Sequence, residues 1–385
     1  MTTSRRPGAN RQQSARSSGL GGPAPCTGDD PASGARRHRG GIQDPGDVTG
    51  YGGRVAADRS TSPPMMGVRP PGRPVDDTPR VAVAGREVAV AYTYRLAGPD
   101  LIVMVHGLGC TRESFRTAFT SPALAGYSLC AIDLPGHGAS DTLGRLSTIA
   151  HLADAVAAVA HRFAGLRLHL VGHSLGGAVT VAAAPQLRVV SLVSIEGNLL
   201  PADCGLISRA TAAQPLHSYL QSGFDTFVAG LRTSPDRASR VWAGWLARCD
   251  PVAIHTAARS LVDTCDHGQL PNLLADMAHT AYVHGVHSDV SHILPLFDPA
   301  SVYEIAGTGH FPMIDNPASL WHTLATTTQA ASRPPAGNEP APGEAASIIT
   351  AAARTTRGDV RRHQRIPAGG TGMPSRKRHG PVGDG

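Results

Sequence analysis

The stretch Leu168-His169-Leu170-Val171-Gly172-His173-Ser174-Leu175-Gly176-Gly177 decides the fold of this chain. An apolar run of strand length ends abruptly in the pattern G-x-S-x-G, and the mostly small residues 178–184 follow it. This order predicts a strand, a sharp turn and a helix. We expect the glycines beside Ser174 to let strand and helix approach closely, while the serine takes a strained backbone conformation. The turn would then push the Ser174 hydroxyl out above the sheet, toward the N–H groups that begin the helix.

The chain of 385 residues divides by composition into a central part and two ends. Residues 1–79 and 331–385 are rich in Arg, Gly, Pro, Ser and Ala and lack sustained periodicity. Because such segments bury too little apolar surface to offset chain entropy, we expect two disordered tails, of which the second is basic. Residues 80–330, about 250 residues, have the size of one α/β domain with an insertion.

The positive charge of the chain belongs to the two tails. Residues 1–79 hold 11 Arg against 7 acidic residues, and residues 331–385 hold 9 Arg or Lys against 4. The central part holds 15 Arg against 18 acidic residues. Since the folded part is mildly acidic, nucleic-acid binding is a disfavoured function despite the net charge of +6.

Other patterns in the sequence disfavour metal binding, secretion and membrane insertion. The six cysteines show neither C-x-x-C nor a His/Cys spacing typical of zinc, so we expect no metal and buried, reduced thiols. No apolar segment follows Arg5-Arg6, and no run of about 18 apolar residues is present. We therefore expect no membrane span and a cytoplasmic location.

Strand and helix patterns alternate on both sides of the Ser174 stretch. Residues 80–95 predict a β-hairpin that turns at Gly85-Arg86-Glu87, and residues 101–105 and 127–132 predict buried strands. A helix is expected up to Phe163, with Ser147 or Thr148 as its N-cap. After the helix that follows Ser174, strands are expected at 189–195, 280–284 and 301–306, and a last helix at 318–326.

Residues 198–275 lose this alternation and are mostly helical in pattern. They carry a large share of the aromatic residues in a chain with only 4% aromatics: Tyr219, Phe224, Phe227, Trp242 and Trp245. As a set these side chains favour an apolar pocket roof, and we expect about two of the five to face a substrate.

The Gly172–Gly176 pattern and three further segments together resemble the α/β-hydrolase fold family. The segments are His106-Gly107-Leu108-Gly109, Asp133-Leu134-Pro135-Gly136-His137-Gly138-Ala139-Ser140-Asp141 and Gly307-Thr308-Gly309-His310-Phe311-Pro312-Met313. The resemblance covers residues 80–330. It implies an α/β fold with a mostly parallel central sheet, helices on both of its faces and a helical cap at about 198–275.

The resemblance also implies a catalytic triad in the chain order serine, acid, histidine. A serine needs a base within hydrogen-bond reach, and the base needs a carboxylate that holds its tautomer. Ser174 is the expected nucleophile and His310 the expected base. Asp289, which follows the penultimate strand, is the favoured acid, and Glu196 at the end of the preceding strand is the alternative.

The remaining site residues follow from the same resemblance. The backbone N–H groups of Leu108 and Leu175 would hold the oxyanion. Trp242, Trp245 and Phe224 are the candidate pocket residues. The predicted function is a serine hydrolase that cleaves a small carboxylic ester, or an amide or thioester, through an acyl-enzyme and without metal or organic cofactor. The alternatives are a triad-bearing small-molecule receptor with slow turnover, or a lyase, a haloperoxidase-like enzyme or an acyltransferase of the same fold.

Overall fold

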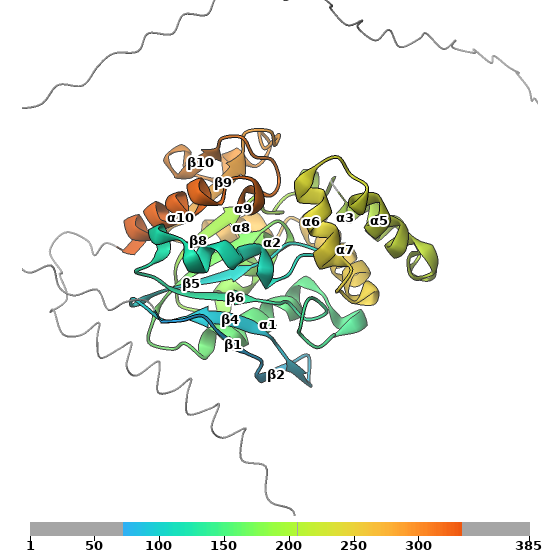
Figure 1. The fold of residues 1–385 in the computed structure, drawn as a ribbon, viewed down its shortest axis with the longest axis horizontal. Helices are drawn as coiled ribbons and strands as arrows, with labels where there is room; N and C mark the ends of the chain where they lie inside the picture. The colour runs from blue at the N-terminus through green and yellow to red at the C-terminus, as the bar shows by residue number, and fades with distance from the viewer. Residues whose placement is uncertain (1–71, 206, 333–385) are drawn as a thin grey trace, which may run out of the picture. The chain divides into compact units, whose positions relative to one another are not determined.

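A computed structural model describes residues 72–205 and 207–332 (Figure 1). Residues 1–71 and 333–385, which hold nearly all of the two predicted tails, lie outside the described residues. The folded part is longer than expected at both ends. Strand β1 (Val75–Asp77) pairs antiparallel with β4 (Tyr92–Arg95), and helix α10 (Pro317–Ser332) runs past residue 330. The predicted domain limits of 80 and 330 are therefore too narrow.

An eight-stranded sheet lies at the centre of the fold, in the order β1-β4-β6-β5-β7-β8-β9-β10. Its parallel strands are β5 (Asp100–Val105), β6 (Ser128–Ile132), β7 (Arg167–His173), β8 (Val189–Ile195), β9 (Thr280–Gly285) and β10 (Val302–Ile305). Strands β1 and β4 are antiparallel to their neighbours at one edge. The mostly parallel sheet confirms the predicted fold class.

The predicted hairpin is present as a separate two-stranded sheet. Strands β2 (Arg80–Val83) and β3 (Arg86–Ala89) pair antiparallel around a turn in which Ala84 and Gly85 both have positive φ. The turn therefore begins one residue earlier than the sequence indicates. Strand β4 leaves this hairpin and joins the main sheet beside β6.

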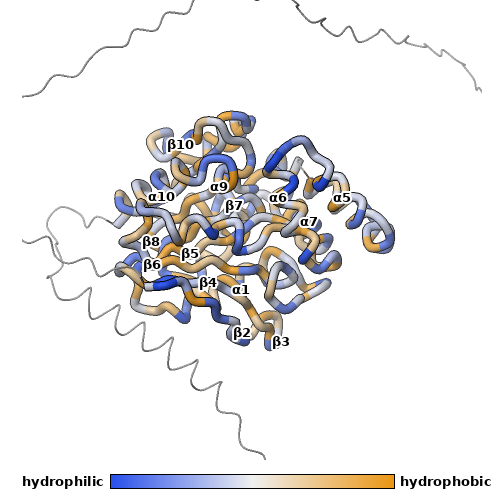
Figure 2. Tube along the Cα trace, viewed as in Figure 1, coloured by the Kyte–Doolittle hydropathy of each residue, from blue (hydrophilic) through white to orange (hydrophobic). Residues whose placement is uncertain are grey.

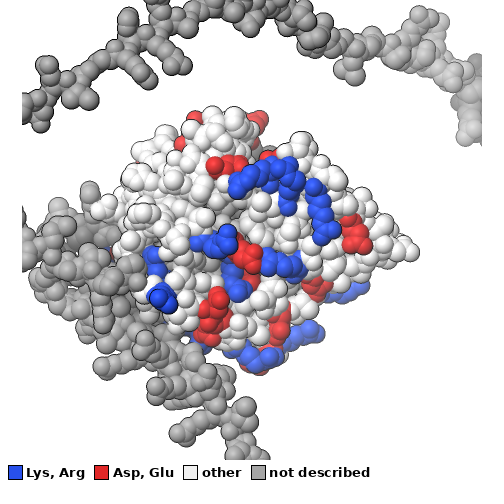
Figure 3. Space-filling view, in the orientation of Figure 1, with Lys and Arg blue, Asp and Glu red and all other residues white. Residues whose placement is uncertain are grey.

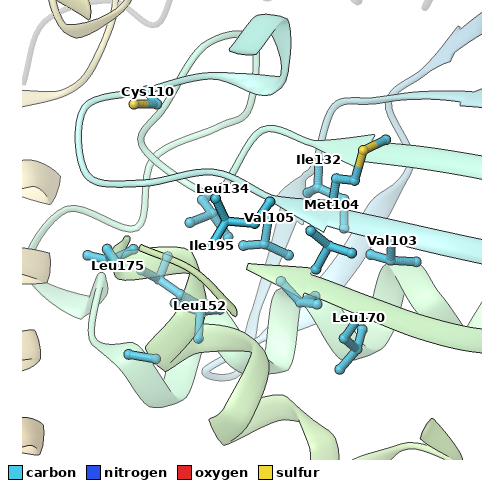
Figure 4. Close-up of a cluster of buried hydrophobic side chains, with 14 of the residues drawn as sticks. Val103, Met104, Val105, Cys110, Ile132, Leu134, Leu152, Leu170, Leu175 and Ile195 are labelled. Carbon is cyan, nitrogen blue, oxygen red and sulfur yellow. The ribbon is translucent and has the colours of Figure 1, made fainter. Parts of the chain in front are cut away.

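The apolar runs of the sequence form a core on both sides of the sheet (Figure 2). Every residue of β6 is buried, and five of the six residues of β5 are buried. Figure 4 shows how strand side chains such as Val105 and Ile195 meet Leu152 and Leu175 from the covering helices. This burial on both faces is what continuous apolar strands require.

Helices cover both faces of the sheet. Helix α1 (Ile149–His161) packs against α2 (Leu175–Ala183), whereas α10 packs against β8 and against the short helix η2 (Pro122–Leu124). Thr148 is the N-cap of α1, because its side-chain oxygen accepts a hydrogen bond from the N–H of His151. A 3₁₀ helix, η1 (Arg112–Thr120), packs against β4, β5 and β6.

A run of helices separates β8 from β9, as the sequence predicts. They are η5 (Pro201–Gly205), α3 (Ser208–Ala213), α4 (Leu216–Ser218), η6 (Tyr219–Gly223), α5 (Phe224–Arg232), α6 (Arg237–Leu246), α7 (Pro251–Asp266) and α8 (Leu270–Ala275). Figure 1 shows α3, α5, α6 and α7 gathered beyond one end of the sheet. Helix α8 packs against α2 instead, so it belongs to the body of the fold. The helical insertion is thus shorter than the predicted 198–275.

The described surface carries charges of both signs. On the face drawn in Figure 3, basic residues lie beside acidic residues. One such ion pair is bidentate, between Arg248 and Glu113. No helix within residues 72–205 and 207–332 is long and apolar enough to cross a membrane.

Candidate active site

Ser174 lies in the sharp turn between β7 and α2, as predicted. Its φ of 53° and ψ of −123° are unusual for a residue with a side chain, and such strain is typical of functional sites. A Cβ on Gly172 would lie 2.2 Å from the oxygen of Gly176, and a Cβ on Gly176 would lie 2.2 Å from the oxygen of Val105. Only glycine fits at both positions, which explains the G-x-S-x-G spacing.

His310 lies in the loop after β10, with its Nε2 3.1 Å from the Ser174 hydroxyl oxygen. This loop comes close to the end of β9, where a Cβ on Gly285 would lie 2.4 Å from the oxygen of Thr308. The ring of His173 donates from Nε2 to the backbone oxygen of His310 at 2.8 Å. Serine and imidazole, 136 residues apart in the chain, are thereby held within hydrogen-bond distance.

The carboxylate beside His310 is that of Glu196. Its Oε2 lies 3.4 Å from Nδ1 of His310, and its Oε1 accepts a 2.7 Å hydrogen bond from the N–H of Gly285. Glu196 is 7% exposed and has a positive φ of 49° at the end of β8. Since β8 is the neighbour of β7, the ends of these strands place acid and serine side by side.

The expectation that Asp289 faces His310 is wrong. The Asp289 side chain is exposed, and its Oδ1 accepts hydrogen bonds from the N–H and the hydroxyl of Ser291. These bonds hold the pKa of the Asp289 carboxyl below its usual range. The physical reason lies in the loop after β9, which turns at Gly285 with a hydrogen bond from Ser288. Asp289 follows that turn, whereas Glu196 directly ends its strand.

Asn198 is a site residue that the sequence reasoning missed. The Ser174 hydroxyl lies 3.1 Å from Asn198 Oδ1, and the Asn198 N–H donates to the backbone oxygen of Ser174 at 3.1 Å. The Asn198 amide nitrogen donates to the backbone oxygen of Asp203 at 2.5 Å, which fixes the orientation of the amide. The sequence did contain a pattern that indicates Asn198, because Glu196-Gly197-Asn198 puts two polar side chains at the end of a predicted strand.

Of the two predicted oxyanion donors, Leu108 lines the cavity that holds Ser174, and Leu175 directly follows the serine in the chain. Leu175 is the first residue of α2, and the first N–H groups of a helix have no partner within it. The N–H of Leu108 has no hydrogen-bond partner in the described part of the chain. The oxygen of Leu108 accepts a 3.0 Å hydrogen bond from the indole of Trp242 on α6. The helical insertion is therefore fastened directly to this loop.

A small cavity of about 20 Å³ lies at Ser174. Trp242 lines it, as predicted, together with Leu108, Asn198, His310 and Phe311. The other two predicted pocket residues do not line it. Phe224 packs against Tyr219 at a ring distance of 6.0 Å, and Trp245 is a buried side chain of the insertion.

Phe227 lines a second cavity next to the first. Its ring packs on Trp242 at 5.3 Å. Two of the five aromatic side chains of the insertion thus face cavities at the site, although one of them is not the residue expected.

Two buried histidines near the serine are held neutral. Burial lowers the pKa of His106 to about 4, and His106 Nε2 accepts a hydrogen bond from the N–H of Leu134. Burial also lowers the pKa of His173 well below its usual value. Asp133 is held by Arg112 and by the N–H of Ala139, so its carboxylate shapes its own loop. Among the described residues, no group of three or more His, Cys, Asp or Glu side chains could hold a metal ion.

Curated relatives share short stretches with this chain. The dihydrolipoyllysine-residue acetyltransferase component of the acetoin cleaving system of Cupriavidus necator is 32% identical over 114 residues, which are 29% of this chain and 30% of that protein. A 2-hydroxy-6-oxononadienedioate/2-hydroxy-6-oxononatrienedioate hydrolase of Paraburkholderia phymatum is 32% identical over 124 residues, 31% of this chain and 43% of that protein. The chain thus matches less than half the length of either relative.

Solved structures and a family profile extend the comparison over most of the folded part. The N-acyl homoserine lactonase AidH with bound N-butanoyl homoserine superposes with a TM-score of 0.54 at 18% identity, over 65% of this chain and 96% of that one. An esterase from Exiguobacterium antarcticum gives a TM-score of 0.54 at 16% identity, over 66% and 100%. The profile of the alpha/beta hydrolase family matches residues 102–321, more than half of the sequence. With this match and an eight-stranded, mostly parallel sheet, the chain belongs to the alpha/beta hydrolase family.

Proposed function

We propose that this chain is a serine hydrolase that cleaves small carboxylic esters through an acyl-enzyme. Ser174 attacks the carbonyl carbon, and its proton passes to Nε2 of His310. His310 then gives that proton to the leaving alcohol oxygen as the bond between carbon and oxygen breaks. Water, deprotonated by the same histidine, releases the acid and restores the serine.

Glu196 is the acid of this triad. Its Oε2 accepts from Nδ1–H of His310, so Nε2 is left free to take the serine proton, and its charge stabilises the imidazolium that forms. The N–H groups of Leu108 and Leu175 receive the charge on the carbonyl oxygen. Helices α3 to α7 form the cap over the substrate.

One observation carries the proposal. The Ser174 oxygen lies 3.1 Å from His310 Nε2, and the opposite ring nitrogen faces a carboxylate that is 7% exposed. A buried carboxylate, an imidazole and a hydroxyl in this order form an activated nucleophile. The esterase and the hydrolase named above are both hydrolases, in agreement with the proposed reaction class.

The test combines covalent labelling with turnover. A fluorophosphonate probe should label the wild-type protein at Ser174 and should not label the Ser174→Ala variant. Wild-type protein should hydrolyse p-nitrophenyl acetate over many turnovers, and the variant should lose at least about 10³-fold in kcat. A matched p-nitroanilide distinguishes ester from amide cleavage.

Two results would overturn the proposal. Absence of labelling at Ser174 would remove the nucleophile. Labelling without sustained turnover of any ester would instead support a triad-bearing receptor, the alternative function of a different class.

A further inference from the structure

Two cavities that differ in size and lining lie on either side of His310, and Ser174 borders the smaller of them. The inner cavity, about 20 Å³, is lined by Ser174 and Leu108 together with the polar residues Asn198, Asp203 and Ser208. The outer groove, about 610 Å³, is lined by the apolar residues Ile207, Phe227, Leu231, Ala238, Trp242 and Phe311. A substrate larger than the inner cavity therefore has a second, more apolar space available.

His310 lies in the wall between the two cavities. Its ring borders both, together with Ile207, Trp242 and Phe311. The backbone of its loop, at Gly307 and Gly309, lines the outer groove only. Ser174 and the oxyanion residue Leu108 border the inner cavity only.

The chemistry of the reaction assigns the two parts of an ester to these spaces. The imidazole must protonate the leaving oxygen, so the alcohol part has to lie on the histidine side of the carbonyl carbon. That side is the outer groove. The acyl part stays bonded to Ser174 with its oxygen at Leu108, so it remains in the inner cavity.

Size and lining then define the substrate. The inner cavity, at about 20 Å³, is far smaller than the roughly 300–1,000 Å³ typical of ligand pockets and is partly polar, so it suits only a short acyl group. The outer groove presents aromatic and aliphatic side chains, which suit a bulky apolar alcohol.

Two carboxylates, those of Asp236 and Asp315, also line the outer groove. The nearby guanidiniums of Arg237 and Arg240 donate to backbone oxygens and do not line it. A negatively charged alcohol is therefore disfavoured.

We propose that the natural substrate is an ester of a short-chain acid with a bulky, apolar and non-anionic alcohol, bound with its acyl group in the inner cavity and its alcohol in the outer groove. This inference rests on the proposed serine-esterase function.

Two ester series test the assignment. The first keeps the acetyl group and lengthens the alcohol, from methyl through butyl to octyl acetate. The second keeps the methyl alcohol and lengthens the acid, from acetate through butanoate to octanoate. Because primary alcohols differ little in acidity, intrinsic reactivity changes little along the first series. We expect kcat/KM, measured by acid release, to rise at least about tenfold along the alcohol series and to fall beyond butanoate in the acid series.

A pair of matched leucine variants locates the effect. Leu231→Ala shortens a side chain of the outer groove and should lower the ratio of kcat/KM for octyl acetate to that for methyl acetate by about tenfold. Leu220→Ala, on the exposed surface of the same insertion and outside both cavities, should leave that ratio unchanged.

The outcomes separate this inference from the proposed function. If Ser174 is labelled and esters turn over, but kcat/KM follows acid length or neither length, the assignment of the cavities is wrong. If both leucine variants change the ratio equally, the outer groove does not hold the alcohol. If no ester in either series is hydrolysed and Ser174 is not labelled, the serine-esterase function itself fails.

Discussion

Replacing Glu196 by glutamine tests whether the acid of the triad is the residue that the geometry favours. Oε1 of Glu196 accepts from the N–H of Gly285 at 2.7 Å, so the oxygen of a glutamine must remain at that position. The amide nitrogen then faces Nδ1 of His310, where Oε2 now lies at 3.4 Å. Two donors cannot face each other, so Nδ1 must become the acceptor and the ring proton must move to Nε2.

That change of tautomer is what costs activity. An imidazole protonated at Nε2 cannot accept the proton of Ser174, whose oxygen lies 3.1 Å away. The same loss in a well-studied serine protease lowers kcat about 10⁴-fold, equivalent to about 5.5 kcal/mol of activation free energy. Because glutamine has the shape of glutamate and keeps the bond to Gly285, we expect the free energy of unfolding to change by less than about 1 kcal/mol.

Asp289→Asn is the matched control. An asparagine oxygen can accept both hydrogen bonds that Ser291 now donates to the exposed Asp289 carboxylate. We expect kcat within about twofold of wild type and a change in stability below about 0.5 kcal/mol. The assay is kcat for p-nitrophenyl acetate, and the Ser174→Ala variant gives the residual rate without the nucleophile. Urea unfolding checks that each variant is folded. A loss in Asp289→Asn as large as that in Glu196→Gln, or more than a tenth of wild-type kcat in Glu196→Gln, would show that Glu196 is not the acid of the triad.

Three further changes probe the framework of the site. Trp242→Phe keeps the apolar contact but removes the 3.0 Å hydrogen bond to the oxygen of Leu108, so kcat should fall about fivefold, as measured with p-nitrophenyl acetate. Gly176→Ala puts a Cβ 2.2 Å from a backbone oxygen of β5 and should lower the free energy of unfolding in urea by about 3 kcal/mol. Gly244→Ala is the control: a Cβ there has no atom within 4 Å, so this variant should not destabilise the protein. Burial lowers the pKa of His106 to about 4, whereas an unfolded histidine titrates near about 6.5. The stability that the neutral His106 ring contributes is therefore complete above about pH 6.5 and is lost as the pH falls through about 4. His106 alone should therefore lower the free energy of unfolding by about 1.4 kcal/mol per pH unit across that window, in addition to the slope from the other buried histidines. Urea unfolding at a series of pH values should show that the slope is smaller by this amount in His106→Gln.

The parts of the fold that the sequence predicts well are those in which local pattern and global packing agree. The run Leu101–Val105 is apolar throughout and forms the buried part of β5. The turn at Ser174 is predictable because two close backbone contacts leave room only for glycine at 172 and 176. Steric requirements of this kind restrict the residue type at a position, so they can be recognised in the sequence.

The short edge strand β1 has no sequence pattern that predicts a strand. Val75–Asp77 reads as polar tail, with Pro and Gly on its N-terminal side. It joins the sheet through pairing with Tyr92–Arg95, and Asp77 accepts a 2.8 Å hydrogen bond from the hydroxyl of Tyr92. Pairing with a strand 15 or more residues away is tertiary information, which periodicity within a three-residue segment cannot express.

The pocket residues illustrate a similar limit. Phe224, Phe227, Trp242 and Trp245 are equally apolar in the sequence, yet Trp242 and Phe227 alone among them line the cavities beside His310. Which face of a helix meets the site depends on how the insertion is fastened. The hydrogen bond from Trp242 to Leu108 fastens the insertion to the site, and it joins residues 134 positions apart in the chain.

The position of the acid is decided by the backbone rather than by chain order. Both Glu196 and Asp289 satisfy the order serine, acid, histidine, so order alone cannot choose between them. Within residues 72–205 and 207–332, Ala84, Ser174 and Glu196 are the non-glycine residues with positive φ. Ala84 is explained by its hairpin turn, whereas Ser174 and Glu196 end the adjacent strands β7 and β8.

A positive φ at a non-glycine residue costs about 1–3 kcal/mol. Two such residues on adjacent strands therefore persist only where hydrogen bonds and packing fix both backbone conformations. The Ser174 N–H donates to the oxygen of Ile195, and the Glu196 N–H donates to the oxygen of Val283, so each bend is fixed by the next strand of the sheet. Gly285 completes the arrangement, because it donates to Glu196 and admits the His310 loop at the same point. An acid in the loop after β9 has no comparable support, and its carboxylate bonds to Ser291 within its own turn. The sheet thus selects Glu196 because the hydrogen bonds that bend the end of β8 also aim its carboxylate at the imidazole.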